Sequence, residues 1–233
     1  ASLVGSEMCI RDSIYCECGL NENHRTRSKL PTRAEVKEAL IHKLSSMQAE
    51  GVAPDVITFA GNGEPTMHPE FAGIIDDTIE TRNRFFPKAK IAVLSNSTML
   101  YKEDVFQALN KIEDNILKLD SISDSRIVQL NVPNSPAFTF DRLLEQLCRF
   151  NGNLIIQTMF LKGEVNGESV TNTTEHEISG WLEALKQIKP KQVMIYTIDR
   201  ETPVKNLKKV TKDELEAIAD RARQEGFEVM VSA

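Results

Sequence analysis

Three of the four cysteines in this chain, Cys9, Cys16 and Cys18, fall within ten residues of one another. Thiolates at so short a spacing indicate metal or redox chemistry more than a disulfide scaffold. Cys16 and Cys18 alone are a weak signal, because two cysteines cannot complete a zinc site or an iron–sulfur cluster. The four histidines are scattered and do not form an H-E-x-x-H pattern.

A second group of residues with chemical potential is the run Gly61, Asn62, Gly63, Glu64 and Pro65, which directly follows an apolar segment. Glycine permits a positive φ and lets a ligand approach the backbone closely. A carboxylate together with backbone carbonyls would suit a ligand that carries an amino group. The alternative is an ordinary turn between a strand and a helix with an exposed glutamate, and the spacing alone leaves both open.

Polar side chains also follow or interrupt other apolar segments. Ser95 and Asn96 could bind a ribose or a carboxylate, or they could cap the next helix. Asp120 has the same two interpretations. Gln157 lies among apolar neighbours and needs a hydrogen-bonding partner if it is buried. Tyr196 stands near the end of a further apolar segment. Polar groups at so many corresponding positions are typical of a binding site.

Apolar segments that predict strands alternate with segments of helical periodicity from about residue 32 onward. Thr32 and Thr211 are each followed three residues later by Glu, which predicts capping boxes at two helix starts. Pro69 is suited to the first turn of another helix. The alternation predicts parallel β-α-β units in one domain, as a partial barrel or an open doubly wound sheet. We expect strands near residues 55–60, 91–94, 115–120, 154–161, 192–198 and 227–231.

The carboxyl ends of these strands are the expected location of the site. In both architectures functional residues gather where parallel strands end. We therefore expect one cavity to collect Glu64, Ser95, Asn96, Asp120 and Gln157.

Composition narrows the class of protein. Hydrophobic residues make up 41% of the chain and charged residues 27%, which is ordinary for a globular protein. The net charge of −6 disfavours broad, non-specific binding of nucleic acid, although a local basic patch stays open. No apolar run approaches the roughly 18 residues that span a membrane, and no secretory signal is evident. We therefore expect a cytoplasmic protein without a membrane segment.

The two groups of residues resemble the motifs of one family. Residues 14–19, Ile-Tyr-Cys-Glu-Cys-Gly, resemble the end of the C-x3-C-x2-C loop of the radical S-adenosylmethionine (radical SAM) family, and residues 61–65 resemble its GGEP motif. The longer string GNGEPTMHPEF resembles the branch with wyosine-type tRNA-modifying enzymes and related iron–sulfur oxidoreductases. The resemblance covers about residues 9–232. It implies an α/β fold, a partial (β/α)6 TIM-like barrel of parallel strands with outer helices, whose first strand is missing here.

The resemblance implies roles for individual residues. In this family three cysteine thiolates hold a [4Fe-4S] cluster, and S-adenosylmethionine binds the open iron. The reduced cluster cleaves the cofactor to a 5′-deoxyadenosyl radical, which abstracts hydrogen from a substrate. By position, Cys9 and Cys16 match metal ligands, Tyr15 matches an aromatic residue near the adenine, and residues 61–65 match the site for the methionine amino group. Contacts to ribose, carboxylate or substrate are implied for Ser95, Asn96, Asp120 and Gln157. An electron donor such as flavodoxin or ferredoxin is also implied.

The chain departs from the family pattern at one position. The second ligand falls on Ser13, so the segment reads C-x3-S-x2-C. Residues 2–13 also resemble a translated sequencing adapter, and the chain begins with Ala. We therefore expect residues 1–13 to be non-native or disordered and residues 14–233 to form the radical SAM core domain. The native chain would then continue upstream of Ile14 with two further cysteines; a serine ligand is the alternative.

Other functions stay open at this point. A zinc or redox module could use Cys16 and Cys18, and a degenerate barrel could bind a nucleotide or a partner without catalysis. The substrate is not identified, and tRNA is one candidate. A basic cluster that would suit tRNA, or would simply be a solvated loop and helix start, consists of Lys205, Lys208, Lys209 and Lys212.

Overall fold

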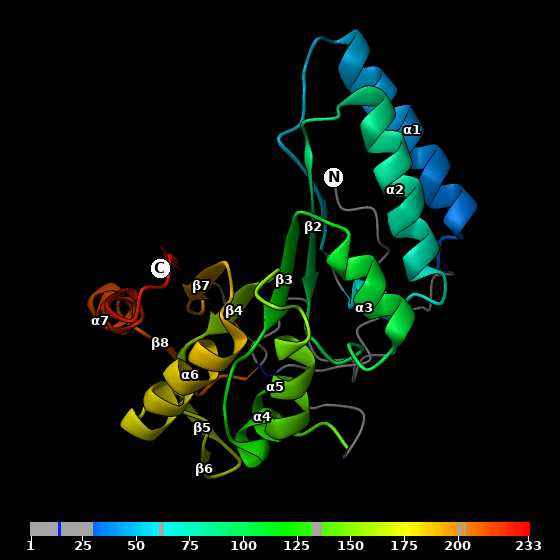
Figure 1. Cartoon of the computed structure of the whole chain (residues 1–233). Coiled ribbons are helices and arrows are strands. Elements are labelled where there is room, and N and C mark those ends of the chain that lie inside the picture. The colour runs from blue at the N-terminus through cyan, green and yellow to red at the C-terminus, as the bar shows by residue number, and fades with distance from the viewer. Residues whose placement is uncertain (1–13, 15–29, 61–62, 132–136, 200–201, 203) are drawn as a thin grey trace. The chain divides into compact units, whose positions relative to one another are not determined.

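The computed structural model describes residues 14, 30–60, 63–131, 137–199, 202 and 204–233. Contacts divide the chain into two compact units. Of the described residues, those from 30 to 116 belong to unit 1, and Ile14 together with those from 117 onward belongs to unit 2. We describe each unit by itself (Figure 1).

Unit 1 consists of helices outside parallel strands. Its elements are α1 (Arg33–Ala49), β1 (Val56–Phe59), the 3-10 turn η1 (Pro65–Met67), α2 (Phe71–Phe85), β2 (Lys90–Ser95), α3 (Glu103–Asn110) and the first part of β3 (Asp114–Lys118). Strands β1 and β2 pair in parallel, with Ile57 opposite Ile91 and Phe59 opposite Val93. These four apolar side chains are buried.

Helices α1 and α2 lie side by side in unit 1 (Figure 1). The predicted capping box at Thr32 is confirmed: its hydroxyl accepts from the Glu35 amide, and the Glu35 carboxylate accepts from the Thr32 amide. Gly73 of α2 leaves room for Arg33, because a Cβ atom there would lie 2.4 Å from the Arg33 Nη1 atom. Arg33 thereby reaches Asp77, with Nε 2.6 Å from Oδ2.

Unit 2 continues the parallel arrangement and adds a small antiparallel sheet. Its elements are the end of β3, α4 (Asp124–Asn131), α5 (Phe140–Cys148), β4 (Ile155–Met159), β5 (Leu161–Val165), β6 (Glu168–Ser169), α6 (Glu175–Ile188), β7 (Gln192–Tyr196), β8 (Leu207–Lys209), α7 (Lys212–Gln224) and β9 (Val229–Ser232). Strand β7 pairs in parallel with both β4 and β9. Strand β5 pairs antiparallel with β6 and with β8.

The predicted α/β class and its parallel strands are confirmed. The strand order of the six-stranded sheet is β1-β2-β3-β4-β7-β9, and the antiparallel sheet has the order β6-β5-β8. Two local predictions were wrong in detail. The segment 154–161 forms parts of two strands, β4 and β5, which belong to different sheets. Helix α2 begins at Phe71, after Pro69. Helix α4 and the antiparallel sheet were not predicted.

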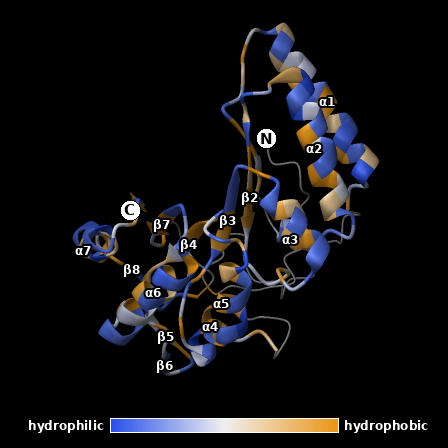
Figure 2. Cartoon of the chain, in the orientation of Figure 1, coloured by the Kyte–Doolittle hydropathy of each residue, from blue (hydrophilic) through white to orange (hydrophobic). Residues whose placement is uncertain are grey.

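The hydropathy of the elements follows their burial (Figure 2). Helix α7 is largely hydrophilic and β2 is largely hydrophobic. In α7 the buried positions are confined to one narrow stripe, Leu215, Ile218, Ala219 and Ala222. Its capping box, Thr211 with Glu214, is confirmed. Among the described residues, none of the helices has the length and apolar character that a membrane crossing requires.

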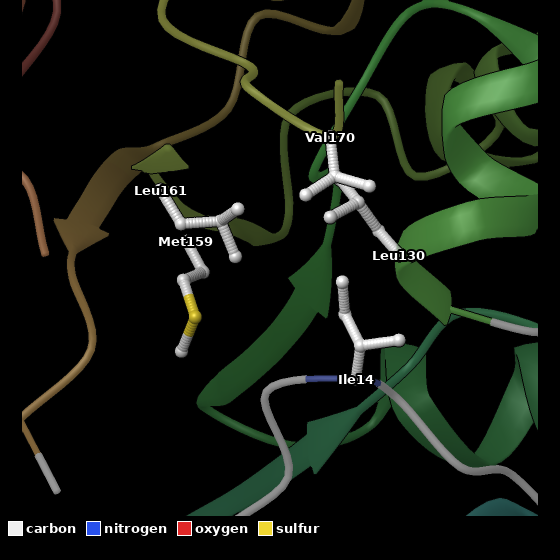
Figure 3. Close-up of a cluster of buried hydrophobic side chains, with 5 residues drawn as sticks. All are labelled: Ile14, Leu130, Met159, Leu161 and Val170. Atoms are coloured by element: carbon white, nitrogen blue, oxygen red, sulfur yellow. The ribbon is translucent and has the colours of Figure 1, made fainter. Parts of the chain in front are cut away.

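A separate apolar cluster in unit 2 holds the residue that precedes the cysteine segment. Ile14 is 6% exposed and its amide donates to the Leu130 carbonyl over 3.2 Å. Figure 3 shows its side chain directed into a group with Leu130, Met159, Leu161 and Val170. This contact fixes the chain one residue before Tyr15 and two before Cys16.

Candidate functional site

Glu64, at the carboxyl end of β1, is a buried acid that accepts four hydrogen bonds from its own chain. Its side chain is almost completely enclosed, since the residue is 5% exposed. Oε1 accepts from the Thr66 amide at 3.1 Å, from the Thr66 hydroxyl and from the Ser95 hydroxyl at 2.8 Å. Oε2 accepts from the Asn96 amide at 2.6 Å. The carboxylate therefore joins the loop after β1 to the loop after β2.

These donors are all neutral, which affects the charge state of Glu64. Burial raises the pKa of the Glu64 carboxyl above its ordinary value, while the hydrogen bonds act in the opposite direction. The structure thus brings together three of the predicted residues, Glu64, Ser95 and Asn96. A direct contact between the Glu64 carboxylate and a ligand stays a prediction.

The turn after β2 has an unusual backbone. Ser97 has a φ of 68°, in the left-handed region that residues other than glycine rarely occupy, and it is 2% exposed. The turn is held by the Ser97 amide donating to the Ser95 hydroxyl and by the Thr98 amide donating to Asn96 Oδ1. Helix α3 begins later, at Glu103 after Lys102, so Ser95 and Asn96 do not cap it. Backbone strain of this kind is common where a loop holds a ligand.

Asp120, which follows β3 in unit 2, is also buried but has a charged neighbour. Its side chain is 0% exposed, and Oδ2 lies 3.7 Å from the Lys118 ammonium. Oδ1 accepts from the Met159 amide at 2.9 Å. Asn172 fixes the same corner, because its Nδ2 donates to the carbonyls of both Asp120 and Met159. Asp120 is thus held by the amide of the last residue of β4 and by the ammonium of Lys118.

Lys118 connects Asp120 to a third strand. Its ammonium donates to the Tyr196 hydroxyl over 2.5 Å and lies 5.1 Å from the centre of the Tyr196 ring. Tyr196 is opposite Met159 in the parallel register of β4 and β7. Gln157, the other predicted residue of this unit, is half-buried two positions before Met159, on the same face of β4.

Sequence reasoning missed Lys118 as a site residue. A signal for it exists: Lys118 is a cation inside the predicted strand segment 115–120, two residues before Asp120, and in an extended segment side chains two residues apart point to the same side. Its partner Tyr196 was noted in the sequence, but no local pattern connects two residues that lie 78 positions apart.

Several predicted site residues lie outside the described residues. These are Cys9, Ser13, Tyr15, Cys16, Cys18, Gly61 and Asn62. Of the remaining loop residues, Gly63 is half-buried and Pro65 begins the turn η1. Within the described ranges, no group of three or more His, Cys, Asp and Glu side chains is arranged to hold a metal ion. The shared cavity for the predicted residues of the two units stays a prediction.

A pocket of about 880 Å³ lies in unit 1, and it is lined by the first residues of three strands, Val56, Lys90 and Asp114. It is therefore near the amino ends of β1, β2 and β3, at the opposite end from Glu64. Ligand sites in such sheets lie at the carboxyl ends of the strands. None of the predicted site residues lines this pocket.

The chain is similar to several curated proteins, although no protein-family model matches it. It is 29% identical over 217 residues to a UPF0026 protein of Helicobacter pylori, covering 90% of this chain and 64% of that protein. It is 25% identical over 207 residues to the UPF0026 protein of Methanocaldococcus jannaschii, covering 87% and 60%. A 24% identity over 218 residues links it to the GTPase Obg of Brachyspira hyodysenteriae, covering 92% and 30%. The chain spans less than two thirds of each relative's length.

Solved structures resemble the chain over nearly its whole length. SuiB of Streptococcus suis bound to S-adenosylmethionine has a TM-score of 0.68 at 15% identity, covering 98% of this chain and 49% of SuiB. TYW1 with a lysine-pyruvate adduct has a TM-score of 0.61 at 13% identity, covering 94% and 71%. HemN of Escherichia coli, a radical SAM enzyme, has a TM-score of 0.55 at 11% identity, covering 95% and 50%. The chain therefore has the fold of the radical SAM enzymes.

Proposed function

We propose that the protein to which this chain belongs is a radical SAM enzyme that abstracts hydrogen from its substrate. When bound, an iron–sulfur cluster and S-adenosylmethionine supply the radical. Three observations support the proposal: the fold, the Gly-Asn-Gly-Glu-Pro loop at the carboxyl end of β1, and the spacing of Cys9 and Cys16. The observation that carries it is the Glu64 carboxylate, which holds the loops after two neighbouring strands in one fixed arrangement.

The residues of unit 1 suit the methionine end of the cofactor. Because Glu64 accepts four hydrogen bonds from its own chain, we assign it the task of holding the loop. The backbone carbonyls of residues 61–63 would then accept from the amino group. Ser95 and Asn96 would donate to the carboxylate or the ribose. We assign contacts to the sugar or the substrate to Asp120 and Gln157, and contact with the adenine to Tyr15.

The cluster ligands decide whether this chain itself is active. Cys9 and Cys16 would provide two thiolates, and Ser13 stands where the third is needed. Serine is a harder and far less acidic ligand than cysteine, whereas iron–sulfur clusters favour soft thiolates. We therefore expect the chain as given to hold little stable cluster and to form little 5′-deoxyadenosine.

The experiment is anaerobic reconstitution with iron and sulfide, followed by measurement of bound iron and of 5′-deoxyadenosine under reducing conditions. We compare the unaltered chain, Ser13→Cys, and a chain whose residues 1–13 are replaced by the upstream segment of a UPF0026 relative. The matched control is Cys148→Ala, which removes the half-buried thiol of α5. Bound iron should rise in Ser13→Cys, and both readouts should rise in the replaced chain. A replaced chain that binds iron but makes no 5′-deoxyadenosine would contradict the proposal.

A second candidate function, a barrel that binds a nucleotide without catalysis, is favoured by Ser13. Calorimetric titration with S-adenosylmethionine separates the two candidates. A catalytic site should bind the cofactor much more tightly with the cluster in place. A purely binding site should have the same affinity with and without iron.

The substrate is a further proposal, and tRNA is the candidate that the basic residues favour. Lys205, Lys208, Lys209 and Lys212 are all exposed. In the antiparallel pair of β5 and β8, Lys208 is opposite Lys162, which adds one more lysine to this basic group. Filter binding to unmodified tRNA, with a double charge reversal at Lys208 and Lys209, tests this. Binding that is weak and unchanged by the reversal would reject it.

A further inference from the structure

Tyr196, Lys118 and Asp120 form a triad in unit 2. The proposed function assigns a contact to Asp120 but gives no task to Tyr196 or Lys118. We infer that Tyr196 is a proton-transfer residue that acts on a hydroxyl group of the substrate, with Lys118 and Asp120 as its positioning residues. The inference rests on the proposed function, because it identifies the substrate as a compound whose reacting carbon carries a hydroxyl.

The first argument is location. Lys118 is the last residue of β3 and Tyr196 is the last residue of β7, while Asp120 comes two residues after the end of β3. Their side chains meet across the end of β4, as the contacts of Lys118 with Tyr196 and of Asp120 with the Met159 amide show. The carboxyl ends of parallel strands are where α/β enzymes place reacting groups.

The second argument is electrostatic. An ammonium that donates to a phenol oxygen over 2.5 Å favours the phenolate over the phenol. In the adjoining strands the residues opposite Tyr196 are the neutral Met159 of β4 and the neutral Ser232 of β9. Lys118, from the end of β3, is a charged group in direct hydrogen-bonding contact with the phenol oxygen, and Asp120 lies behind it at 3.7 Å from the ammonium.

The third argument is the direction of the phenol hydrogen. In the phenol form the Tyr196 oxygen accepts from Lys118, so its own hydrogen points away from the ammonium, and in the phenolate form that side of the oxygen is where a substrate proton would bind. Asp120, whose side chain is 0% exposed, keeps Lys118 in place from the other side at 3.7 Å. A tyrosine that only filled space could be satisfied by a backbone carbonyl. Placing the Lys118–Asp120 ion pair against the Tyr196 phenol carries a desolvation cost. Buried charged groups retained in spite of such a cost are typical of functional sites.

The proposed step is a proton transfer without any change in oxidation state. The O–H bond of the substrate hydroxyl breaks, and the O–H bond of Tyr196 forms from its phenolate. The alkoxide that remains lies beside the positive charge of Lys118, which stays protonated and paired with Asp120. Loss of a hydrogen atom from a carbon makes the hydroxyl on that carbon more acidic, so a base at this position is needed once abstraction has occurred.

The test follows the ionisation of Tyr196 itself and requires no cluster or substrate. The chain contains three tyrosines, so the ultraviolet phenolate absorbance of Tyr196→Phe is subtracted from that of the unaltered chain at each pH. We expect Tyr196 to ionise at least one pH unit below the ordinary value of about 10. In Lys118→Met the acid dissociation constant of Tyr196 should fall by about tenfold or more, so that the phenol ionises at a higher pH. The matched control is Lys162→Met, which removes a lysine paired with the exposed Glu214 and should leave the titration unchanged.

Two outcomes would overturn the inference: ionisation of Tyr196 at or above the ordinary value, or an identical titration in Lys118→Met. If Lys118→Met does not fold, the difference between the unaltered chain and Tyr196→Phe decides alone. These results concern the triad and not the cofactor. A chain with residues 1–13 replaced that forms 5′-deoxyadenosine but shows an ordinary Tyr196 refutes the triad. A replaced chain that has an acidic Tyr196, binds iron and forms no 5′-deoxyadenosine refutes the proposed function.

Discussion

Two buried carboxylates, Glu64 in unit 1 and Asp120 in unit 2, follow parallel strands and have corresponding positions in the sequence pattern, yet their surroundings differ. Among the described residues, Glu64 accepts only from hydroxyls and backbone amides. Asp120 accepts from one backbone amide and lies beside the ammonium of Lys118. The difference shows that one acid ties two loops together, whereas the other holds a cation against a tyrosine.

The largest expected effect is the loss of the Glu64 carboxylate. In Glu64→Ala the Thr66 amide and hydroxyl, the Ser95 hydroxyl and the Asn96 amide all lose their acceptor inside the protein. Each unsatisfied buried group costs roughly 1–3 kcal/mol, so the loss in the free energy of unfolding should reach about 4–5 kcal/mol, the upper end for single substitutions. Urea denaturation measures it.

The control for Glu64→Ala is Glu80→Ala, which removes an acid with a 72% exposed side chain paired with Lys37. That change should cost less than about 1 kcal/mol. Equal effects of the two variants would show that Glu64 does not hold the loops.

A smaller effect is expected at Asp120. Asp120→Asn keeps an acceptor for the Met159 amide but removes the charge beside Lys118, whose side chain is 19% exposed. We expect a loss of about 1–2 kcal/mol, because a partly buried cation loses its partner. Asp76→Asn, which breaks an exposed pair with Lys111, should change the free energy of unfolding by roughly 0–1 kcal/mol and serves as the matched comparison.

The pH dependence of stability tests the surroundings of Glu64. Since burial raises the pKa of Glu64 in the folded state, the folded chain binds more protons than the unfolded chain above the ordinary value of 4.5. The contribution of Glu64 to stability should therefore fall as the pH rises from about 4.5 through the raised pKa. The measurement is the free energy of unfolding of the unaltered chain minus that of Glu64→Gln, between about pH 4 and pH 8. A difference that grows with pH would contradict the raised pKa.

The smallest effect is expected at Ser97. Its φ of 68° is strained for serine and free of strain for glycine. Ser97→Gly should change the free energy of unfolding by no more than about 1 kcal/mol, because relief of strain is offset by the greater freedom of glycine in the unfolded chain. In the active protein, affinity for S-adenosylmethionine should fall if the strained turn holds the cofactor. Unchanged affinity would show that the strain has only a structural origin.

The sequence by itself determined the alternation of strands and helices, both capping boxes and the position of Glu64, Ser95 and Asn96 at strand ends. These features depend on periodicity and on side chains within a few residues of one another, such as Thr32 with Glu35. The place of Asp120 after β3 follows from the same local pattern.

Only the tertiary structure decided which groups these residues meet. The segment 154–161 divides because β5 pairs with β8, a partner more than 40 positions away. Glu64 meets Ser95 and Asn96 because β1 and β2 are paired in one register. Lys118 meets Tyr196 across β4, which no local pattern could indicate. The surroundings then set the chemistry, since a buried carboxylate among neutral donors ties two loops together at Glu64, whereas a buried carboxylate beside an ammonium holds that cation against a tyrosine at Asp120.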